Sequence, residues 1–153
     1  MTNETRALKF YTITRADKIY RGIWLLVQAT LYRYSPFFMF KFRCLLLKIF
    51  GAKIDYSFRP YSTTRIWMPK NLSSLSGSGL GPGVELYNPG PIILGKNVNI
   101  SQHAYLCSAS RREKKGMFTL VTGEIEVGDN VWIAAKAFIG PSLKIGEHSI
   151  VGA

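Results

Sequence analysis

Two histidines are the side chains of this sequence best suited to moving a proton near neutral pH. His103 lies in the segment ISQHAYL and His148 in the segment IGEHS. The unperturbed pKa of an imidazole is close to neutrality, so a histidine can act as a general base in the cell. His103 is the candidate base. A surface or packing role is the alternative for it, and the same role is expected for His148.

A basic run, RREKK from Arg111 to Lys115, offers donors for an anion. A guanidinium binds phosphate through two parallel hydrogen bonds, so Arg111 and Arg112 are candidate ligands of a phosphate-bearing molecule. A solvated loop without a ligand is the alternative.

The two cysteines, Cys44 and Cys107, lie far apart in segments of different texture. This spacing indicates neither a disulfide framework nor a zinc site, so we expect two idle thiols in a reducing cytoplasm and no bound metal.

Composition and charge limit the class of protein and of partner. The chain has 153 residues, 47% hydrophobic and 19% charged, which predicts one globular domain. Its net charge of +11 should attract phosphates, nucleotides or acidic lipid headgroups. No nucleic-acid-binding module is recognisable, so we expect no nucleic acid. The N-terminus lacks a secretory signal, and the longest apolar stretch is about half a membrane span, which predicts a cytoplasmic protein.

Branched aliphatic residues recur every six positions and must set the architecture that carries these side chains. The period continues over a long part of the chain at Leu94, Ile100, Leu106, Val127, Ile133, Ile139, Ile145 and Val151. Six is too long for the alternation of a strand and does not fit a helix, so a repeat fold is indicated and an antiparallel sandwich is not. Three hexads would make one turn of a triangular coil with stacked inward aliphatics. A glycine follows five of these residues, which we attribute to corners free of side-chain obstruction.

The repeat is predicted to run over residues 51–153, with irregular early turns. Ile54, Pro60, Ile66 and Leu72 lie six apart, Leu80 and Leu86 resume after a slip, and NPGP adds two residues before Leu94. Residues 109–121 break the period most strongly and are expected to leave the coil as a loop.

An N-terminal helical segment is predicted over residues 1–50. A first helix begins near Asp17 and ends at Ser35-Pro36, since proline disfavours helix at the preceding residue. A second helix should run from Pro36 to Ile49, with Gly51 as its stop. The first helix carries apolar residues at helical spacing at Ile19, Ile23, Leu26, Val27, Thr30 and Leu31, and the second should turn inward Phe40, Leu45 and Leu46.

These patterns resemble a known family. The segments SPFFMFKFRCLLLKIFGAKI, LYNPGPIILGKN, ISQHAYLC and VWIAAKAFIGP are similar to those of the colanic acid biosynthesis acetyltransferases, which are bacterial hexapeptide-repeat acyltransferases. The resemblance covers residues 21–153. It implies a mainly β fold, a left-handed parallel β-helix, and a homotrimer that moves acetyl from acetyl-CoA to a sugar hydroxyl in surface-polysaccharide synthesis, with active sites between adjacent coils.

The resemblance also implies a catalytic base, and here the sequence departs from the family. A Ser-His-Asp stretch follows the LC segment in these proteins, whereas this chain has Arg111 at the histidine and Arg112 at the acid. An arginine cannot act as that base, because its guanidinium stays protonated. Either the chain is inactive, or another residue such as His103 has taken over, or the loop aligns differently.

Binding residues are implied in the same way. Acetyl-CoA is expected in a groove beside the late hexads, where small side chains let it approach the coil. The implied cofactor-binding residues are Trp132, Ala134, Ala135, Lys136, Gly140, Gly152 and Ala153. Arg111 and Arg112 could bind phosphates of coenzyme A or of a lipid-linked saccharide. The amide of Asn88 could bind a sugar hydroxyl, with a turn asparagine as the alternative.

Two further features bear on activity. Ser142 stands where relatives usually have glycine, and the chain stops at Ala153 in mid-turn, where relatives continue through at least another coil. A truncated product with an open edge is therefore expected. The alternative function is a catalytically inactive β-helix that acts as a structural or binding protein.

Residues 17–50 also invite a membrane hypothesis. Aromatic residues there alternate with Arg21, Arg33, Lys41, Arg43 and Lys48, a composition suited to an interfacial helix at the inner face of the membrane. A cap packed on the first coils by the same apolar face is the equal alternative.

Overall fold

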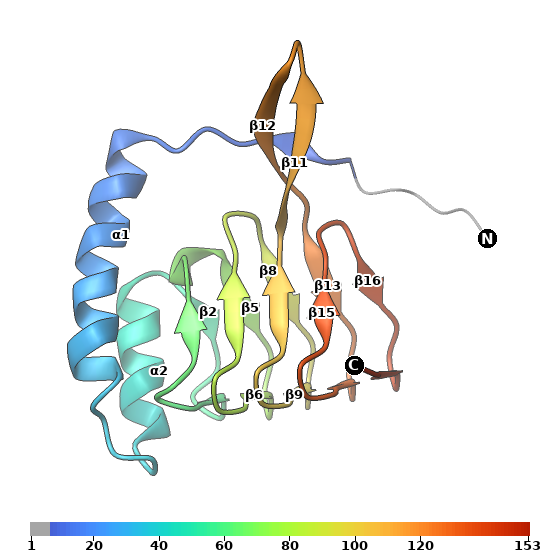
Figure 1. Cartoon of the computed structure of the whole chain (residues 1–153). Helices are drawn as coiled ribbons and strands as arrows, with labels where there is room; N and C mark the ends of the chain where they lie inside the picture. Colours follow the sequence, from blue (N-terminus) through green and yellow to red (C-terminus); the bar gives the residue numbers. More distant parts are fainter. Residues whose placement is uncertain (1–6) are drawn as a thin grey trace.

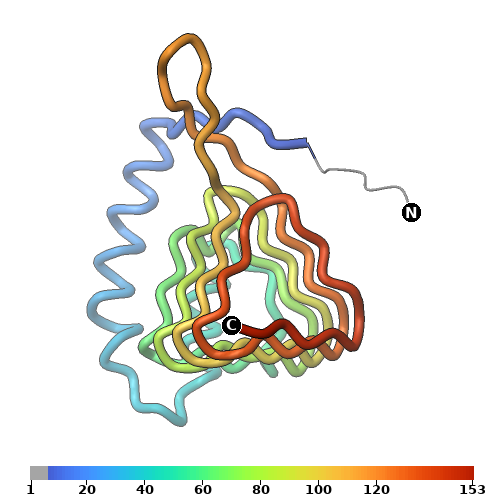
Figure 2. The backbone as a smooth tube through the Cα atoms, turned by 45° about the vertical axis from the view of Figure 1, so that its right-hand side comes forward, coloured from blue at the N-terminus to red at the C-terminus, as the bar shows by residue number. Residues whose placement is uncertain are grey.

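Short strands joined by tight corners wind into a left-handed parallel β-helix of about five turns, which confirms the predicted fold (Figure 1). The computed structural model describes residues 7–153. Successive strands belong to three flat sheets in rotation, so the coil is triangular in cross-section (Figure 2). Sheet I contains β2 (Lys53–Ile54), β5 (Leu72–Ser74), β8 (Ile92–Leu94), β13 (Ile125–Val127) and β16 (Lys144–Ile145). Sheet II contains β3 (Arg59–Pro60), β6 (Gly79–Leu80), β9 (Asn99–Ile100), β14 (Trp132–Ile133) and β17 (Ile150–Val151). Sheet III contains β4 (Arg65–Ile66), β7 (Glu85–Tyr87), β10 (Tyr105–Cys107) and β15 (Phe138–Ile139).

The hexad aliphatics stack in register to form the core. In sheet III, for example, Ile66 pairs with Leu86, Leu86 with Leu106, and Leu106 with Ile139. All four are at most 3% exposed. Burying each such side chain contributes about 1.5–3 kcal/mol, so the ladders supply the main stabilisation of a coil whose strands are only two or three residues long.

The two extra residues that shift the hexad period in the early turns lie one hexad earlier than predicted. The 3₁₀ turn η2 (Pro69–Asn71) adds two residues after sheet III, so Ser74 rather than Leu72 takes the ladder position between Ile54 and Leu94. Leu72 instead joins an extra buried row with Ile92. The sequence interval of six between Ile66 and Leu72 therefore gave the wrong register there.

The corners repeat a left-handed backbone residue, but at a different position from the glycines that follow the ladder aliphatics. Positive φ falls three residues after six of the ladder aliphatics, at Asn97, His103, Asn130, Lys136, Ser142 and His148 (53° to 61°). The glycine just after the aliphatic is explained instead by the close approach of the next coil, which leaves no room for a side chain. A Cβ at Gly128 would lie 2.8 Å from the backbone nitrogen of Glu147, well inside normal contact.

Gly128→Ala is accordingly expected to destabilise the fold by about 1–3 kcal/mol, because backbone of the neighbouring coil must move. Gly146 occupies the same hexad position, but the nearest atom to its Cβ would be 3.8 Å away. Gly146→Ala should therefore leave the midpoint of urea denaturation nearly unchanged. Equal losses in the two variants would refute the close-approach explanation.

Residues 109–122 leave the coil as a β-hairpin instead of an irregular loop. Its strands are β11 (Ala109–Lys114) and β12 (Met117–Thr122), and it projects beyond the outline of the coil (Figure 1). The strand β1 (Lys9–Phe10) pairs antiparallel with β12, within a segment that the sequence assigned to helices. The first six residues of that assignment lie outside the described residues.

The N-terminal helices lie beside each other across the first coil. Helix α1 (Arg15–Val27) begins at a capping box between Thr14 and Asp17 and ends in a π-helical turn, η1 (Gln28–Tyr32). Helix α2 (Phe40–Ile49) starts four residues later than predicted. Neither helix of the described chain has the length and apolar character needed to span a bilayer.

The helix faces differ from the predicted ones. α1 packs on the coil through buried Trp24, whose indole N–H donates to Ile66 O at 2.6 Å. Its apolar stripe points outward, so Ile19, Ile23 and Leu26 are each more than half exposed. In α2, Leu46 is buried as predicted, whereas Leu45 is exposed.

Candidate functional site

His103 lies at the corner between sheets II and III, with its side chain exposed. It forms one layer of a column of left-handed corner residues, with Gly83 in the coil before it and Lys136 in the coil after it. The backbone N–H of His103 donates to Pro82 O at 3.0 Å, and that of Lys136 donates to Gln102 O at 3.1 Å. The imidazole lies over Gly83, where any Cβ would meet its Nδ1 at 2.4 Å. A glycine in the preceding coil therefore makes room for the histidine.

His103 also lines a polar cavity of about 460 Å³. Arg33, Arg65, Glu85 and Thr63 contribute to the same walls. Within residues 7–153 the imidazole has no hydrogen-bond partner that would fix its ring, so both ring nitrogens are available to a ligand. A histidine in an open polar cavity can accept a proton from a hydroxyl that docks beside it.

Most of the implied cofactor residues gather at this corner, one and two coils beyond His103. Trp132 is 47% exposed, and its indole N–H donates to Ser101 Oγ at 2.8 Å, two residues from His103. Ala134, Ala135 and Lys136 form the next corner layer, and Gly152 and Ala153 follow β17 above them. Gly140 lies apart, at the corner between sheets III and I.

Small side chains keep this edge open, but its backbone donors are largely used. The N–H of Trp132 donates to Ser149 O, and that of Ala134 to Val151 O. An extended ligand at this corner would therefore find few free backbone N–H groups on β14.

Arg111 and Arg112 lie on the projecting hairpin, across sheet III from the His103 corner. They stand opposite Leu120 and Thr119 in the β11–β12 ladder, and both are exposed. The structure therefore separates the two arginines from His103 within one chain.

Asn88 is a buried corner residue. Its side-chain nitrogen donates to Met68 O, and its side-chain oxygen accepts from Met68 N–H, both at 2.8 Å. The residue is 0% exposed. This geometry supports the turn role that the sequence also allowed, and leaves the amide no free donor facing solvent.

The outer face of sheet III, which joins the two clusters, carries aromatic side chains that sequence reasoning missed. Trp67 packs edge-on against Tyr87 with ring centroids 5.0 Å apart, and Tyr105 packs against Phe138 at 5.7 Å. Burial, with smaller contributions from Cys107 and Glu85, raises the pKa of Tyr105 to about 12, so it stays a neutral hydrogen-bonding group. These aromatic residues are far apart in the sequence and become neighbours only through the parallel pairing of β4, β7, β10 and β15. Sequence reasoning without that register could not have revealed the surface.

Arg21 of α1 covers one end of this face. Its guanidinium carbon lies 3.6 Å from the centroid of the Trp67 ring. Burial lowers the pKa of Arg21, and its Nε is buried with no hydrogen-bond partner among the described residues. Arg21 is therefore held against the coil and is removed from the basic residues that the sequence offered to a membrane.

Sequence comparison decides the family. No family model matches the chain. It is 34% identical over 131 residues to the "Putative colanic acid biosynthesis acetyltransferase WcaF" of Escherichia coli K12, and equally to the protein of that name from Shigella flexneri. The match covers 86% of this chain and 72% of each relative. The chain belongs to the colanic acid biosynthesis acetyltransferase family.

Solved structures show that the fold of this family member is shared more widely. The chain resembles a maltose O-acetyltransferase from Clostridium difficile 630 at 16% identity and a TM-score of 0.77, over 97% of this chain and 84% of the other. It also resembles the hexapeptide-repeat acetyltransferase VCA0836 from Vibrio cholerae O1 biovar eltor, complexed with acetyl coenzyme A, at 18% identity and a TM-score of 0.78, over 92% and 76%. A galactoside acetyltransferase in complex with coenzyme A gives 17% identity and a TM-score of 0.71, over 97% and 74%.

Membership of the colanic acid acetyltransferase family sharpens the question of the base. The position implied for the family histidine, Arg111, is on the hairpin, whereas His103 is on the coil at the opposite edge of sheet III. A base that has moved to His103 and a base that was lost at the Arg111 position therefore concern two separate places in the structure. Variants at the two positions can distinguish these possibilities.

Proposed function

We propose that the protein is an O-acetyltransferase that moves acetyl from acetyl-CoA to a sugar hydroxyl in surface-polysaccharide synthesis. Membership of the colanic acid biosynthesis acetyltransferase family supports this reaction class. The observation that carries the proposal for this chain is the shared corner of His103, Trp132 and Lys136 on consecutive coils. It puts a candidate base within a few residues of the edge where the thioester would lie.

The reaction needs one proton acceptor and one electrophile. A ring nitrogen of His103 takes the hydroxyl proton while the hydroxyl oxygen forms a bond to the thioester carbonyl carbon. The carbon–sulfur bond then breaks, and the leaving thiolate recovers the proton from the imidazolium. The products are the acetyl ester and free coenzyme A, so atoms and charge balance without an oxidant or metal.

We assign the acceptor to the aromatic outer face of sheet III. Tyr87 and Tyr105 lie on this face between the His103 corner and the hairpin, and a pyranose ring packs its C–H edge on such rings. Arg111 and Arg112 would hold the phosphates of a lipid-linked saccharide or of coenzyme A, because their guanidinium groups are exposed and unpaired by any acid within residues 7–153.

Assembly and location extend the proposal. We propose a homotrimer, with active sites between adjacent coils, which would supply partner groups to fix the imidazole. We also propose that the protein works in the cytoplasm at the inner face of the membrane, through residues 17–50. The mass of the protein by light scattering tests the first statement.

The reaction is tested by titrating acetyl-CoA and following thiol release with a panel of sugars and nucleotide sugars. We expect saturable binding of acetyl-CoA and acceptor-dependent release of one thiol per acetyl ester. Binding without thiol release for any acceptor would favour the inactive, structural alternative, to which the Arg111 substitution points. No binding of acetyl-CoA would overturn the proposal.

A further inference from the structure

The cap at the start of the coil exposes a set of apolar side chains along α1, η1 and the loop that follows. Each of these side chains is more than half exposed. Exposed apolar residues on a soluble protein are normally scattered singly, so a group of them on one side of a helix indicates an interaction surface. We call this surface the anchor face. It consists of Ile19, Ile23 and Leu26 of α1, Leu31 of η1, and Phe37 and Phe38 of the loop that follows.

The helix is held on the coil by its opposite side, so nothing within the described chain covers the anchor face. Trp24 is fully buried, Tyr20 Oη donates to Phe50 O at 2.6 Å, and Lys70 pairs with Asp17 at 2.7 Å. Membrane contact and capping of the coil were alternative explanations of a single apolar stripe. The structure assigns capping to one side of α1 and leaves the stripe for a second partner.

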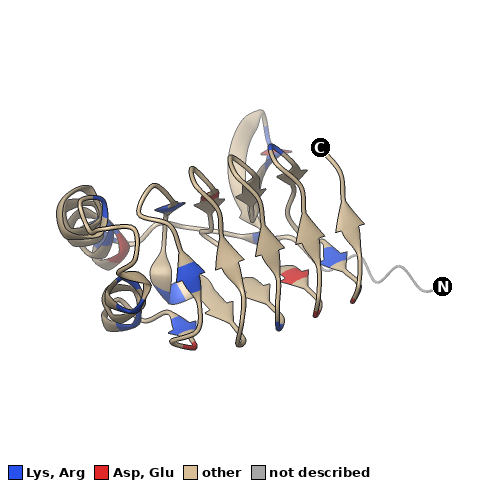
Figure 3. Ribbon diagram, turned by 90° about the horizontal axis from the view of Figure 1, so that it is seen from below, with Lys and Arg blue, Asp and Glu red and all other residues tan. Residues whose placement is uncertain are grey.

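The charge around the anchor face is predominantly positive. Residues 7–60 contain ten lysines and arginines but two acidic residues, Asp17 and Asp55. Arg15, Lys18 and Lys41 are exposed beside the apolar residues, and Asp17 is already paired with Lys70. Figure 3 shows blue segments on both helices at this end of the coil. Apolar side chains bordered by cations match the acyl boundary and phosphates of an anionic bilayer.

The same charges argue against a second copy of this chain as the partner. A two-fold contact through the anchor face would bring the basic rims of both copies together, and residues 15–41 offer one acid, Asp17, which is already paired with Lys70. A lipid surface of negative charge has no such penalty.

We propose that the anchor face docks on an anionic lipid bilayer, with α1 lying in the interface and Phe37 and Phe38 inserted at its end. The two rings pack edge to face with centroids 5.6 Å apart, and phenylalanine on the apolar side of an interfacial helix enters the boundary between headgroups and acyl chains. This inference rests on the membrane location proposed above, for which it names the surface and the charge of the lipid, and it does not depend on acetyl transfer.

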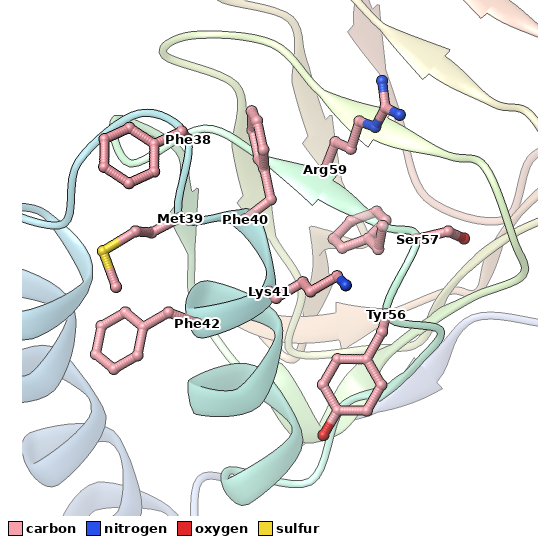
Figure 4. A pocket seen from close by; sticks show the side chains of 9 residues that line it. Phe38, Met39, Phe40, Lys41, Phe42, Tyr56, Ser57 and Arg59 are labelled. Atoms are coloured by element: carbon pink, nitrogen blue, oxygen red, sulfur yellow. The ribbon is translucent and has the colours of Figure 1, made fainter.

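A cavity lies at the edge of the anchor face. It has a volume of about 410 Å³ and is lined largely by aromatic side chains, with Phe38 shared between the cavity and the face. Lys41 lies between Phe40 and Tyr56, and Arg59 reaches out at the same side (Figure 4). An apolar hollow with cations at its rim can receive part of an acyl chain while the cations meet the phosphate.

Co-sedimentation of the full chain with vesicles tests the proposal. We expect binding to vesicles that contain phosphatidylglycerol, weak binding to phosphatidylcholine alone, and release by high salt. Replacing Ile19, Ile23 and Leu26 together by glutamine should lower the partition coefficient about a hundredfold. Replacing Lys18 and Lys41 by glutamine should lower it roughly thirtyfold on anionic vesicles only.

Matched controls come from the far end of the chain. Met117, Phe118 and Ile150 are also well exposed, and their joint replacement by glutamine should leave partitioning unchanged. Lys96→Gln with Lys115→Gln is the control for charge.

The proposal is overturned if wild type binds neither kind of vesicle, or if the control variants lose as much binding. It is also overturned if the Ile19, Ile23 and Leu26 variant changes the mass of the assembly instead, since a second copy would then cover the face. Thiol release with a soluble acceptor should be the same in all variants, which separates this result from the proposed reaction.

Discussion

Replacing His103 by asparagine is expected to lower kcat for acetyl transfer by about 10²- to 10⁴-fold, with little change in KM for acetyl-CoA. This is the usual contribution of a positioned general base. Asparagine suits the test better than alanine, because His103 has a φ of 58° and asparagines already occupy the equivalent corners Asn97 and Asn130. The variant therefore keeps the corner and removes only the proton acceptor. The steady-state rate of thiol release with the best acceptor of the panel measures the effect.

His148→Asn is the matched control for that experiment. His148 has a φ of 57° and is exposed at another corner, so its replacement should leave kcat unchanged. Arg111→His tests the competing account. If wild type is inactive and Arg111→His turns over, the base belonged on the hairpin and His103 has no catalytic role. If His103→Asn is as active as wild type, the relocated base is excluded as well.

Arg43→Met is expected to reduce the free energy of unfolding by about 3–5 kcal/mol, because it removes the centre of a buried polar network. Arg43 is 0% exposed and burial lowers its pKa. Its Nε donates to Pro60 O at 2.7 Å, and its Nη atoms donate to Ser35 Oγ, Pro36 O and Phe37 O at 2.7–2.8 Å. Methionine fills part of the space but has no donor, so Pro60 O and Phe37 O lose the guanidinium, whereas Pro36 O still accepts from Met39 N–H.

Urea denaturation measures this loss, and Lys41→Met is its control on the same helix. Lys41 is exposed, so its replacement should change stability by no more than about 0.5 kcal/mol. A loss in Arg43→Met no larger than in Lys41→Met would show that the loop carbonyls are satisfied by water instead. Arg43→Lys should recover little, since an ammonium cannot span the same acceptors.

Arg43 also shows where sequence reasoning about the cap failed. Its position among Lys41, Lys48 and many aromatics gave it the appearance of a membrane-facing cation. In the structure it holds the loop that carries Phe37 against the first coil. Composition reports which residues are present in a segment, whereas burial depends on which side of a helix meets the rest of the chain.

The candidate site divides in the same way. The outward corner position of His103 follows from counting along the hexad repeat. The same counting could not tell that Asn88 is closed off by Met68, or that Trp67, Tyr87 and Tyr105 share one surface. Those relations join residues about twenty positions apart and require the coil-to-coil register, which two-residue insertions such as η2 shift.

The sequence by itself determined the triangular coil, since a branched aliphatic at every sixth residue can be buried only if each third hexad returns to the same side. It also determined the departure at Arg111, whereas the left-handed corner residues lie two positions after the glycines to which the sequence assigned the corners. Only the tertiary structure decided the direction of the apolar stripe of α1, the burial of Arg43, the hairpin that carries Arg111, and the distance of that hairpin from His103. Each of these depends on contacts between segments far apart in the chain, and such contacts are chosen by packing as a whole instead of by local pattern.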